Sequence, residues 1–217
     1  MADLGFQIRG VEAVTRGMSP LLQFNLQISQ TPATETIQAV MLHAQIQIQS
    51  AQRAYNAREK ERLVELFGAP ERWGQTLRTR LWTHVHATVP GFRDNVAVPL
   101  LVPCTYDLNV TAAKYLYALD GGEVALLFLF SGTIFYEGAE GRLQVQPISW
   151  DKECAYRLPV QAWRDLMEAH YPNSAWLYLN RDVFERLYEY KRQNGITTWD
   201  QTIESLLPVP AREEATV

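Results

Sequence analysis

Two histidines with the spacing of a β-strand are the first residues in this chain that could do chemistry. His84 and His86 are separated by a single residue. Alternate side chains of a strand leave the same face, so the two imidazoles project together roughly 7 Å apart, close enough to share a metal ion. No third ligand is visible nearby, since Asp94 would have to fold back and His43 or His170 would have to arrive from elsewhere. We therefore expect no metal site and assign the pair to an exposed or hydrogen-bonded strand face.

Cys104 is the second chemical candidate, as a thiol nucleophile. The sequence places no oriented histidine beside it, and a reactive thiol needs such a base or a cationic neighbour. Ser131-Gly132 lies inside an apolar run and lacks the G-x-S-x-G spacing of a hydrolase elbow. We expect Cys104 to be a buried, inert thiol. A small metal- or thiol-dependent enzyme that uses His84, His86 and Cys104 is the alternative left open.

The sequence lacks the common motifs that hold cofactors. It contains no Walker A run, no G-x-G-x-x-G and no H-E-x-x-H, so the backbone cradles for phosphates and dinucleotides and the helical zinc-protease site lack their parts. We therefore expect no cofactor and no catalytic residue, and we interpret the protein as a non-enzyme.

Charge and hydropathy exclude several classes of partner. The net charge is −4, which gives no overall attraction for nucleic acid or anionic lipid. The most apolar run, residues 124–130, is too short to span a bilayer. The N-terminal residues show no signal peptide, and two cysteines 50 positions apart do not form a disulfide framework. We expect a cytoplasmic protein with reduced thiols and neither nucleic acid nor membrane as a partner.

Tryptophan is abundant for one domain, and a single core need not hold all of it. Exposed aromatic side chains are favoured at protein interfaces. We predict that Trp73, Trp82 and Trp150 are partly exposed and bind a partner protein, in preference to the tryptophans of the predicted helices. The six tryptophans are Trp73, Trp82, Trp150, Trp163, Trp176 and Trp199.

The elements that must position these residues follow from hydrophobic periodicity. Residues 22–28 and 40–48 alternate apolar and polar side chains, which predicts two half-buried strands joined as an antiparallel hairpin, with Phe6 and Ile8 on a neighbouring strand. A charge-rich helix is predicted over 52–67. Further strands are predicted over 81–89, 96–102, 105–117, 123–136 and 142–148, and Pro99 places the second of these at a sheet edge.

The last third of the chain has helical periodicity. A helix beginning at Pro159 is followed by one capped by Asn180 and a short third one capped by Thr198. We predict one α+β domain over residues 1–207, in which an antiparallel sheet or sandwich (1–150) is covered by C-terminal helices (151–207). Residues 208–217 are predicted to be a disordered tail.

Residues 106–190 resemble the SecB export-chaperone family in the order of their predicted strands and helices. The likeness is carried by the segments 106–112 and 124–135, by Leu158-Pro159 with Arg164, and by Leu179, Phe184, Leu187 and Tyr188. The resemblance implies a SecB-like fold in the C-terminal half and a chaperone-like role, and it leaves a homo-oligomer open.

The whole chain is similar to an uncharacterised bacterial family encoded near high-affinity nickel-iron hydrogenase genes. The segments 66–74, 82–85, 102–107 and 158–164 carry this likeness. The likeness implies that the protein acts in the hydrogenase pathway, with a hydrogenase subunit as its partner. Our hypothesis is a non-catalytic accessory protein that binds a partner polypeptide during hydrogenase assembly. A structural subunit of a larger complex is a further alternative.

Overall fold

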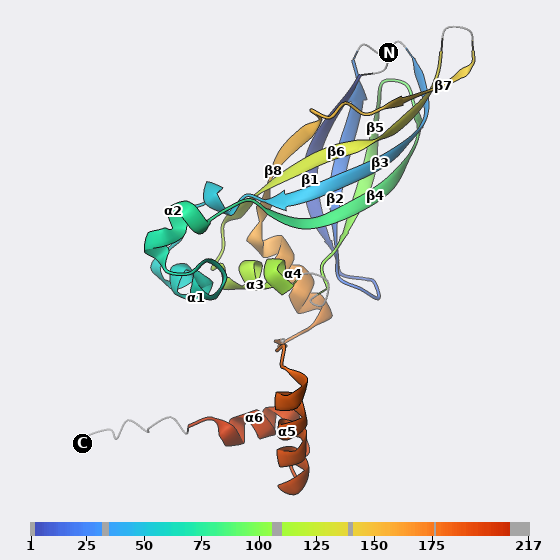
Figure 1. Ribbon diagram of the computed structural model, residues 1–217. Coiled ribbons are helices and arrows are strands. Elements are labelled where there is room, and N and C mark those ends of the chain that lie inside the picture. The colour runs from blue at the N-terminus through green and yellow to red at the C-terminus, as the bar shows by residue number, and fades with distance from the viewer. Residues whose placement is uncertain (1–2, 32–34, 106–109, 139–140, 176, 209–217) are drawn as a thin grey trace, which may run out of the picture. The chain divides into compact units, whose positions relative to one another are not determined.

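The computed structural model describes residues 3–31, 35–105, 110–138, 141–175 and 177–208. The chain forms two compact units, Met1–Ser174 and Ala175–Val217, drawn in Figure 1. The first unit combines antiparallel sheets with helices and the second contains helices. The α+β class predicted from the sequence is therefore confirmed. The predicted tail lies, apart from Pro208, outside the described residues.

The smaller sheet has the order β1-β2-β5 and is antiparallel throughout. Its strands are β1 (Leu4–Val14), β2 (Leu21–Gln30) and β5 (Asn95–Pro103). The alternation predicted for β2 is confirmed, because Leu22, Phe24, Leu26 and Ile28 are fully buried. Pro99 lies on β5 at the end of the strand order, as predicted for a residue that cannot donate to a ladder.

The larger sheet has the order β4-β3-β6-β7, with β8 paired to β6 as well. β7 covers one half of β6 and β8 the other half, so both lie along the same long strand. The strands are β3 (Thr36–Ile48), β4 (Arg80–Phe92), β6 (Glu123–Glu137), β7 (Leu143–Pro147) and β8 (Glu153–Pro159).

Gly132 lies on β6 between the part that pairs with β8 and the part that pairs with β7. Its φ is +140°, and a Cβ built there would lie 2.0 Å from the carbonyl oxygen of Met41 on β3. Its own carbonyl accepts a hydrogen bond from Ile148 just after β7. Close approach of two backbones thus requires glycine at this position.

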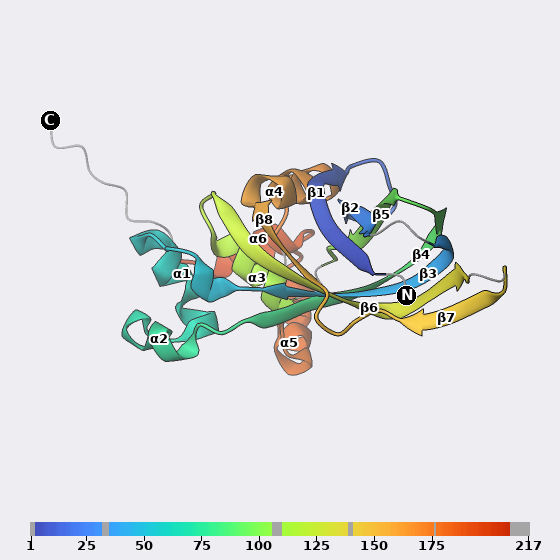
Figure 2. The same ribbon diagram turned by 90° about the horizontal axis from the view of Figure 1, so that it is seen from above.

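The two sheets face one another and enclose the core between them, as Figure 2 shows. Phe24 of β2 contacts Phe128 of β6 edge to face, with ring centroids 5.2 Å apart, and also approaches Trp82 of β4. The predicted hairpin between residues 22–28 and 40–48 is therefore wrong. β2 pairs with β1 and β5, whereas β3 pairs with β4 and β6. Alternation shows which face of a strand is buried but does not identify its hydrogen-bonded neighbour.

Helices gather toward one end of this sandwich (Figure 1). α1 starts at Ala57, five residues later than predicted, because Asn56 and Glu59 form a reciprocal capping box there. Gly68, at φ +74°, ends it. The elements are η1 (Ser50–Gln52), α1 (Ala57–Phe67), η2 (Pro70–Arg72), α2 (Trp73–Thr76), α3 (Val110–Ala118) and α4 (Val160–His170).

Two predicted elements are wrong in this unit. Residues 110–117, expected to be a strand, belong to helix α3, whose buried Ala112, Tyr115 and Leu116 have helical spacing. Residues 106–109 lie outside the described part. Residues 153–159 were expected to belong to the helical third, but they form strand β8. Pro159 is consequently the N-cap of α4 and not its first residue.

The second unit is a pair of helices, α5 (Arg181–Gln193) and α6 (Trp199–Leu206). Gly195, at φ +62°, ends α5 with bonds from its own N–H to Arg192 and from the N–H of Ile196 to Lys191, a Schellman arrangement. The Thr198 side chain accepts a bond from the N–H of Gln201 and caps α6, as predicted. Among the described helices none has both the length and the apolar composition needed to cross a membrane.

Candidate functional site

The predicted partner-binding tryptophans fall into two groups. Trp73 and Trp82 are only 6% and 5% exposed, so the prediction that they are surface residues is wrong. The indole N–H of Trp73 donates to the carbonyl of Gly68 and closes the loop after α1. Trp150, in the turn between β7 and β8, is 95% exposed, as predicted.

Trp199 is an exposed tryptophan on a helix, although the exposed tryptophans were predicted to lie outside the helices. It lies at the start of α6 and is 38% exposed, far more than Trp73 or Trp82. Trp163 of α4 is buried, and Trp176 lies outside the described residues. A large aromatic residue on a short amphipathic helix in a small unit was the signal for Trp199, because such a unit has little core to bury it.

Cys104 lies in the core at the end of β5, and its backbone N–H donates to the carbonyl of Pro20. Desolvation by burial raises the pKa of its thiol to about 12, so the nucleophilic thiolate is scarce at neutral pH. Cys104 and Cys154 are both free. His84 and His86 lie on β4 of the other sheet. The structure therefore does not assemble these three residues into the thiol site considered as an alternative.

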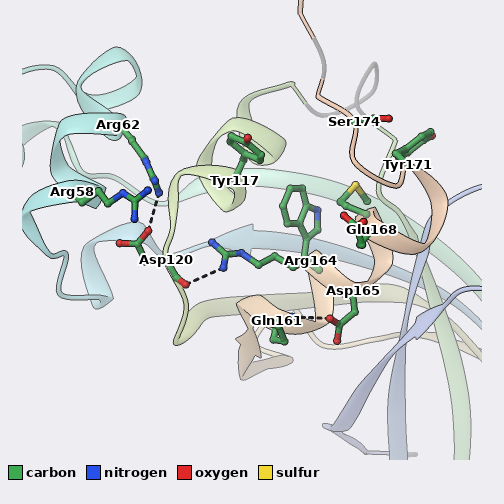
Figure 3. A pocket seen from close by; sticks show the side chains of 12 residues that line it. Arg58, Arg62, Tyr117, Asp120, Gln161, Arg164, Asp165, Glu168, Tyr171 and Ser174 are labelled. Carbon is green, nitrogen blue, oxygen red and sulfur yellow. Dashed lines mark hydrogen bonds and ion pairs between the residues drawn. The ribbon is translucent and has the colours of Figure 1, made fainter. Parts of the chain in front are cut away.

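A cleft of about 870 Å³ opens among α1, α3 and α4 of the first unit (Figure 3). Trp163, Tyr117 and Tyr171 give it an aromatic lining, and cationic and anionic side chains stand around them. The lining residues are Arg58, Arg62, Tyr117, Asp120, Gln161, Trp163, Arg164, Asp165, Met167, Glu168, Tyr171 and Ser174.

Most of the arginine donors near this cleft serve the turn between α3 and β6. Arg164 donates to the carbonyls of Leu119 and Asp120, and Arg62 donates to the carboxylate of Asp120 at 2.8 Å. The two bonds from Arg164 satisfy carbonyls directly after the C-terminal end of α3, where intrahelical donors run out. The side chain of Asn56 and then Arg62 hold the pKa of Asp120 below its usual value.

A buried ion pair also binds the turn between α3 and β6. Arg53 donates to Glu59 at 2.5 Å and to the carbonyl of Gly121 at 2.8 Å. Glu59 also accepts from the backbone N–H groups of Asn56 and Asp120. A buried carboxylate with this many donors has its charge compensated. The arginines therefore stabilise the fold first, and the cleft offers aromatic contact with mixed charge.

The second unit carries an exposed apolar surface, which we call the α5–α6 face. Phe184 and Tyr188 lie one turn apart on α5 and are 46% and 55% exposed. Their rings lie 5.3 and 6.4 Å from that of Trp199 on α6. No residue of α5 is buried, and on α6 only Thr202 is. The face consists of Val183, Phe184, Tyr188, Trp199, Ile203, Leu206 and Leu207.

Comparison with known proteins assigns the chain to a family without giving it an activity. No curated protein and no solved structure matches this sequence. Residues 1–215 match the family of unknown function DUF6084, and the chain belongs to that family.

Proposed function

We propose that this DUF6084 protein is a non-catalytic, chaperone-like accessory protein that binds an apolar segment of a partner polypeptide on its α5–α6 face. The observation that carries the proposal is the exposure of Phe184, Tyr188 and Trp199 on helices that bury almost nothing else. Aromatic residues are enriched at the centres of protein interfaces, where a few anchors supply most of the binding energy.

The size of the second unit supports this interpretation. α5 has 13 residues and α6 has eight, and isolated helices of such length are marginal in water. Units this small rarely bury enough apolar surface to be stable by themselves. Covering the α5–α6 face would remove apolar area from water, which stabilises a complex by roughly 25 cal/mol per Å². Binding of an apolar polypeptide segment would therefore also order the helices.

The rim of the face suits a peptide rather than a small ligand. Lys191 lies over the Trp199 ring at 5.7 Å, and Glu189 pairs with Arg192 at 2.6 Å beside Tyr188. An apolar centre with charges of both signs at its edge is the usual composition of a groove for amphipathic segments. The aromatic, mixed-charge cleft of the first unit offers a second surface of the same chemical type.

The experiment uses the full chain and an unfolded, carboxymethylated globular protein as the probe. We expect saturable binding by calorimetry. Phe184→Ser and Trp199→Ala should each weaken it at least about tenfold, since a removed aromatic anchor costs about 2 kcal/mol or more and about 1.4 kcal/mol is a factor of ten. Arg186→Gln, also exposed on α5, is the matched control and should bind as the parent does.

Four outcomes would contradict this proposal. The parent could fail to bind the unfolded probe, or the face variants could bind as well as Arg186→Gln. Light scattering could also show a dimer that only the face variants dissociate, in which case a second copy of the chain is the occupant. Loss of binding in Trp150→Ala alone would move the site to the β7–β8 turn.

The identity of the partner is the finer part of the proposal. Similarity through segments 66–74 and 158–164 to proteins encoded near hydrogenase genes supports a hydrogenase subunit bound in the cytoplasm. The other SecB-like segments, 124–135 and Leu179, Phe184, Leu187 and Tyr188, support a chaperone-like mode. Segment 106–112 does not add to this support, because residues 110–118 form helix α3. Co-expression with a nickel-iron hydrogenase large subunit tests the pairing: it should co-purify with the parent chain and not with Phe184→Ser.

A further inference from the structure

Three of the chain's four histidines lie together on the outer face of the larger sheet, although they come from two strands. His43 of β3 is opposite His86 of β4 in the register, and His84 lies two residues before His86 on the same face. The ring centroids of His43 and His86 are 4.5 Å apart, and those of His43 and His84 are 5.0 Å apart. The third imidazole that the sequence alone did not supply thus comes from β3.

The surroundings of His43 favour its neutral form and place a hydroxyl beside its ring. Desolvation by burial, then His86 and His84, lower the pKa of His43 below its ordinary value, because each added positive charge would repel the others. The Nδ1 atom of His43 lies 3.3 Å from the hydroxyl of Ser131 on β6. In the tautomer whose Nδ1–H donates to this hydroxyl, the lone pair of Nε2 is available to a metal ion, as with outer-shell partners at metal sites.

We propose that His43, His84 and His86 bind a divalent first-row transition-metal ion above the outer face of the larger sheet. Neutral imidazole is the commonest protein ligand for such ions. Three imidazoles would leave a further coordination position for water or for a ligand from another molecule. This site goes beyond partner binding and does not depend on it, because it lies in the first unit.

Binding requires the rings to turn. His43 and His86 are stacked with their planes 11° apart, so their nitrogens point side by side. Accordingly, no three His, Cys, Asp or Glu side chains in the described part of the chain are already arranged to hold a metal ion. The backbone spacing nevertheless fits, since opposed strand residues have Cβ atoms about 5 Å apart and zinc–imidazole bonds are about 2 Å long.

Two of the three rings, those of His84 and His86, can turn without moving the backbone. His84 and His86 are exposed, and exposed side chains change rotamer on the picosecond to nanosecond scale. A shallow hollow of about 230 Å³, lined by His43, His86, Met41 and Thr88 among others, lies beside the rings. Reorganisation is therefore confined to side chains, with the two paired strands as a fixed support.

The test is calorimetric titration of the untagged, metal-stripped full chain with zinc ions alone, at about pH 7.5, where imidazole is mostly neutral. We expect one ion per chain with micromolar affinity. His43→Gln, His84→Gln and His86→Gln should each weaken binding at least about tenfold. His170→Gln is the control, because His170 lies at the end of α4 and is the only other histidine.

Replacement of zinc by cobalt adds a readout of geometry, since the visible absorption of cobalt distinguishes four-coordinate from six-coordinate sites. Circular dichroism should be the same for the parent and for the three cluster variants, because His43, His84 and His86 do not belong to the core. Absence of zinc binding up to roughly 100 µM would overturn the proposal. So would equal weakening by His170→Gln, or full affinity in His43→Gln.

Discussion

At the scale of single residues, burial decides which polar and aromatic groups are available to other molecules. Cys104 and Trp82 resemble functional residues in the sequence, but both are buried in the core of the sandwich. His43 and Trp199, which were not among the predicted site residues, have accessible rings and close aromatic neighbours. The fold therefore decides which of the candidates can act, and burial makes the Cys104 thiol less reactive.

Thiol titration tests the burial of Cys104 directly. Its pKa is raised to about 12 from 9.0, mainly by desolvation, so the folded thiol remains protonated at pH 7 and reacts slowly. We expect one rapid reaction, at the half-buried Cys154, and a second only after unfolding. Mass spectrometry of alkylated peptides separates the two sites, and fast native labelling of Cys104 would contradict the result.

The same raised pKa has a consequence for stability at alkaline pH. Above pH 9.0 the thiol ionises more readily in the unfolded chain than in the core. The contribution of Cys104 to the free energy of unfolding is therefore fully present below pH 9.0 and declines as pH rises toward about 12. Cys104→Ala should lack this part of the pH dependence in denaturant titrations.

At the scale of elements, β6 organises the larger sheet, because it pairs with β3 along one side and with β7 and β8 along the other. Gly132 lies at the change between the last two strands, where the chain between β7 and β8 leaves the ladder. The lack of a side chain at Gly132 lets the backbone of β6 approach that of β3 closely at this position.

Gly132→Ala should therefore be strongly destabilised. The added Cβ would meet the Met41 carbonyl at 2.0 Å, and its φ of +140° is unfavourable for any other residue. We expect a loss of about 3 kcal/mol or more in the free energy of unfolding, measured by urea titration. Gly74→Ala is the control, since no atom lies within 4 Å of its Cβ position, and helix propensity favours alanine there by about 1 kcal/mol. Equal midpoints for the two variants would refute this account.

At the scale of the whole molecule, the two units differ in how much they bury. The first unit contains two facing sheets with a continuous apolar core, whereas α5 buries no residue. Local stability follows burial, so the helices of the second unit should open far more often than the strands of the first.

Hydrogen exchange measured by mass spectrometry checks this difference. Peptides from α5 and α6 should exchange at least about a hundredfold faster than peptides from β2, β3 and β6, which corresponds to a difference of about 3 kcal/mol in opening free energy. Addition of the unfolded probe should slow exchange in α5 and α6 and leave the strands unchanged. Uniform protection across the chain would show that the helices are stabilised by other contacts.

Local sequence by itself determined the hydrophobic periodicities and most of the positions where strands and helices begin or end. The alternation in β2 identified its buried face, Pro99 marked an outer strand, and Thr198 marked the start of α6. These features depend on a residue and its neighbours within a few positions, because side-chain direction and capping are local properties of the backbone.

Only the tertiary structure decided which strands pair and which faces stay exposed. The choice between a β2–β3 hairpin and two facing sheets depends on partners far apart in the chain, such as Asn25 with Pro99 or His43 with His86. Both arrangements satisfy the same alternating pattern, since burial of an apolar face does not specify what covers it. For that reason the sequence predicted a pair of histidines, and the fold added His43 as the third.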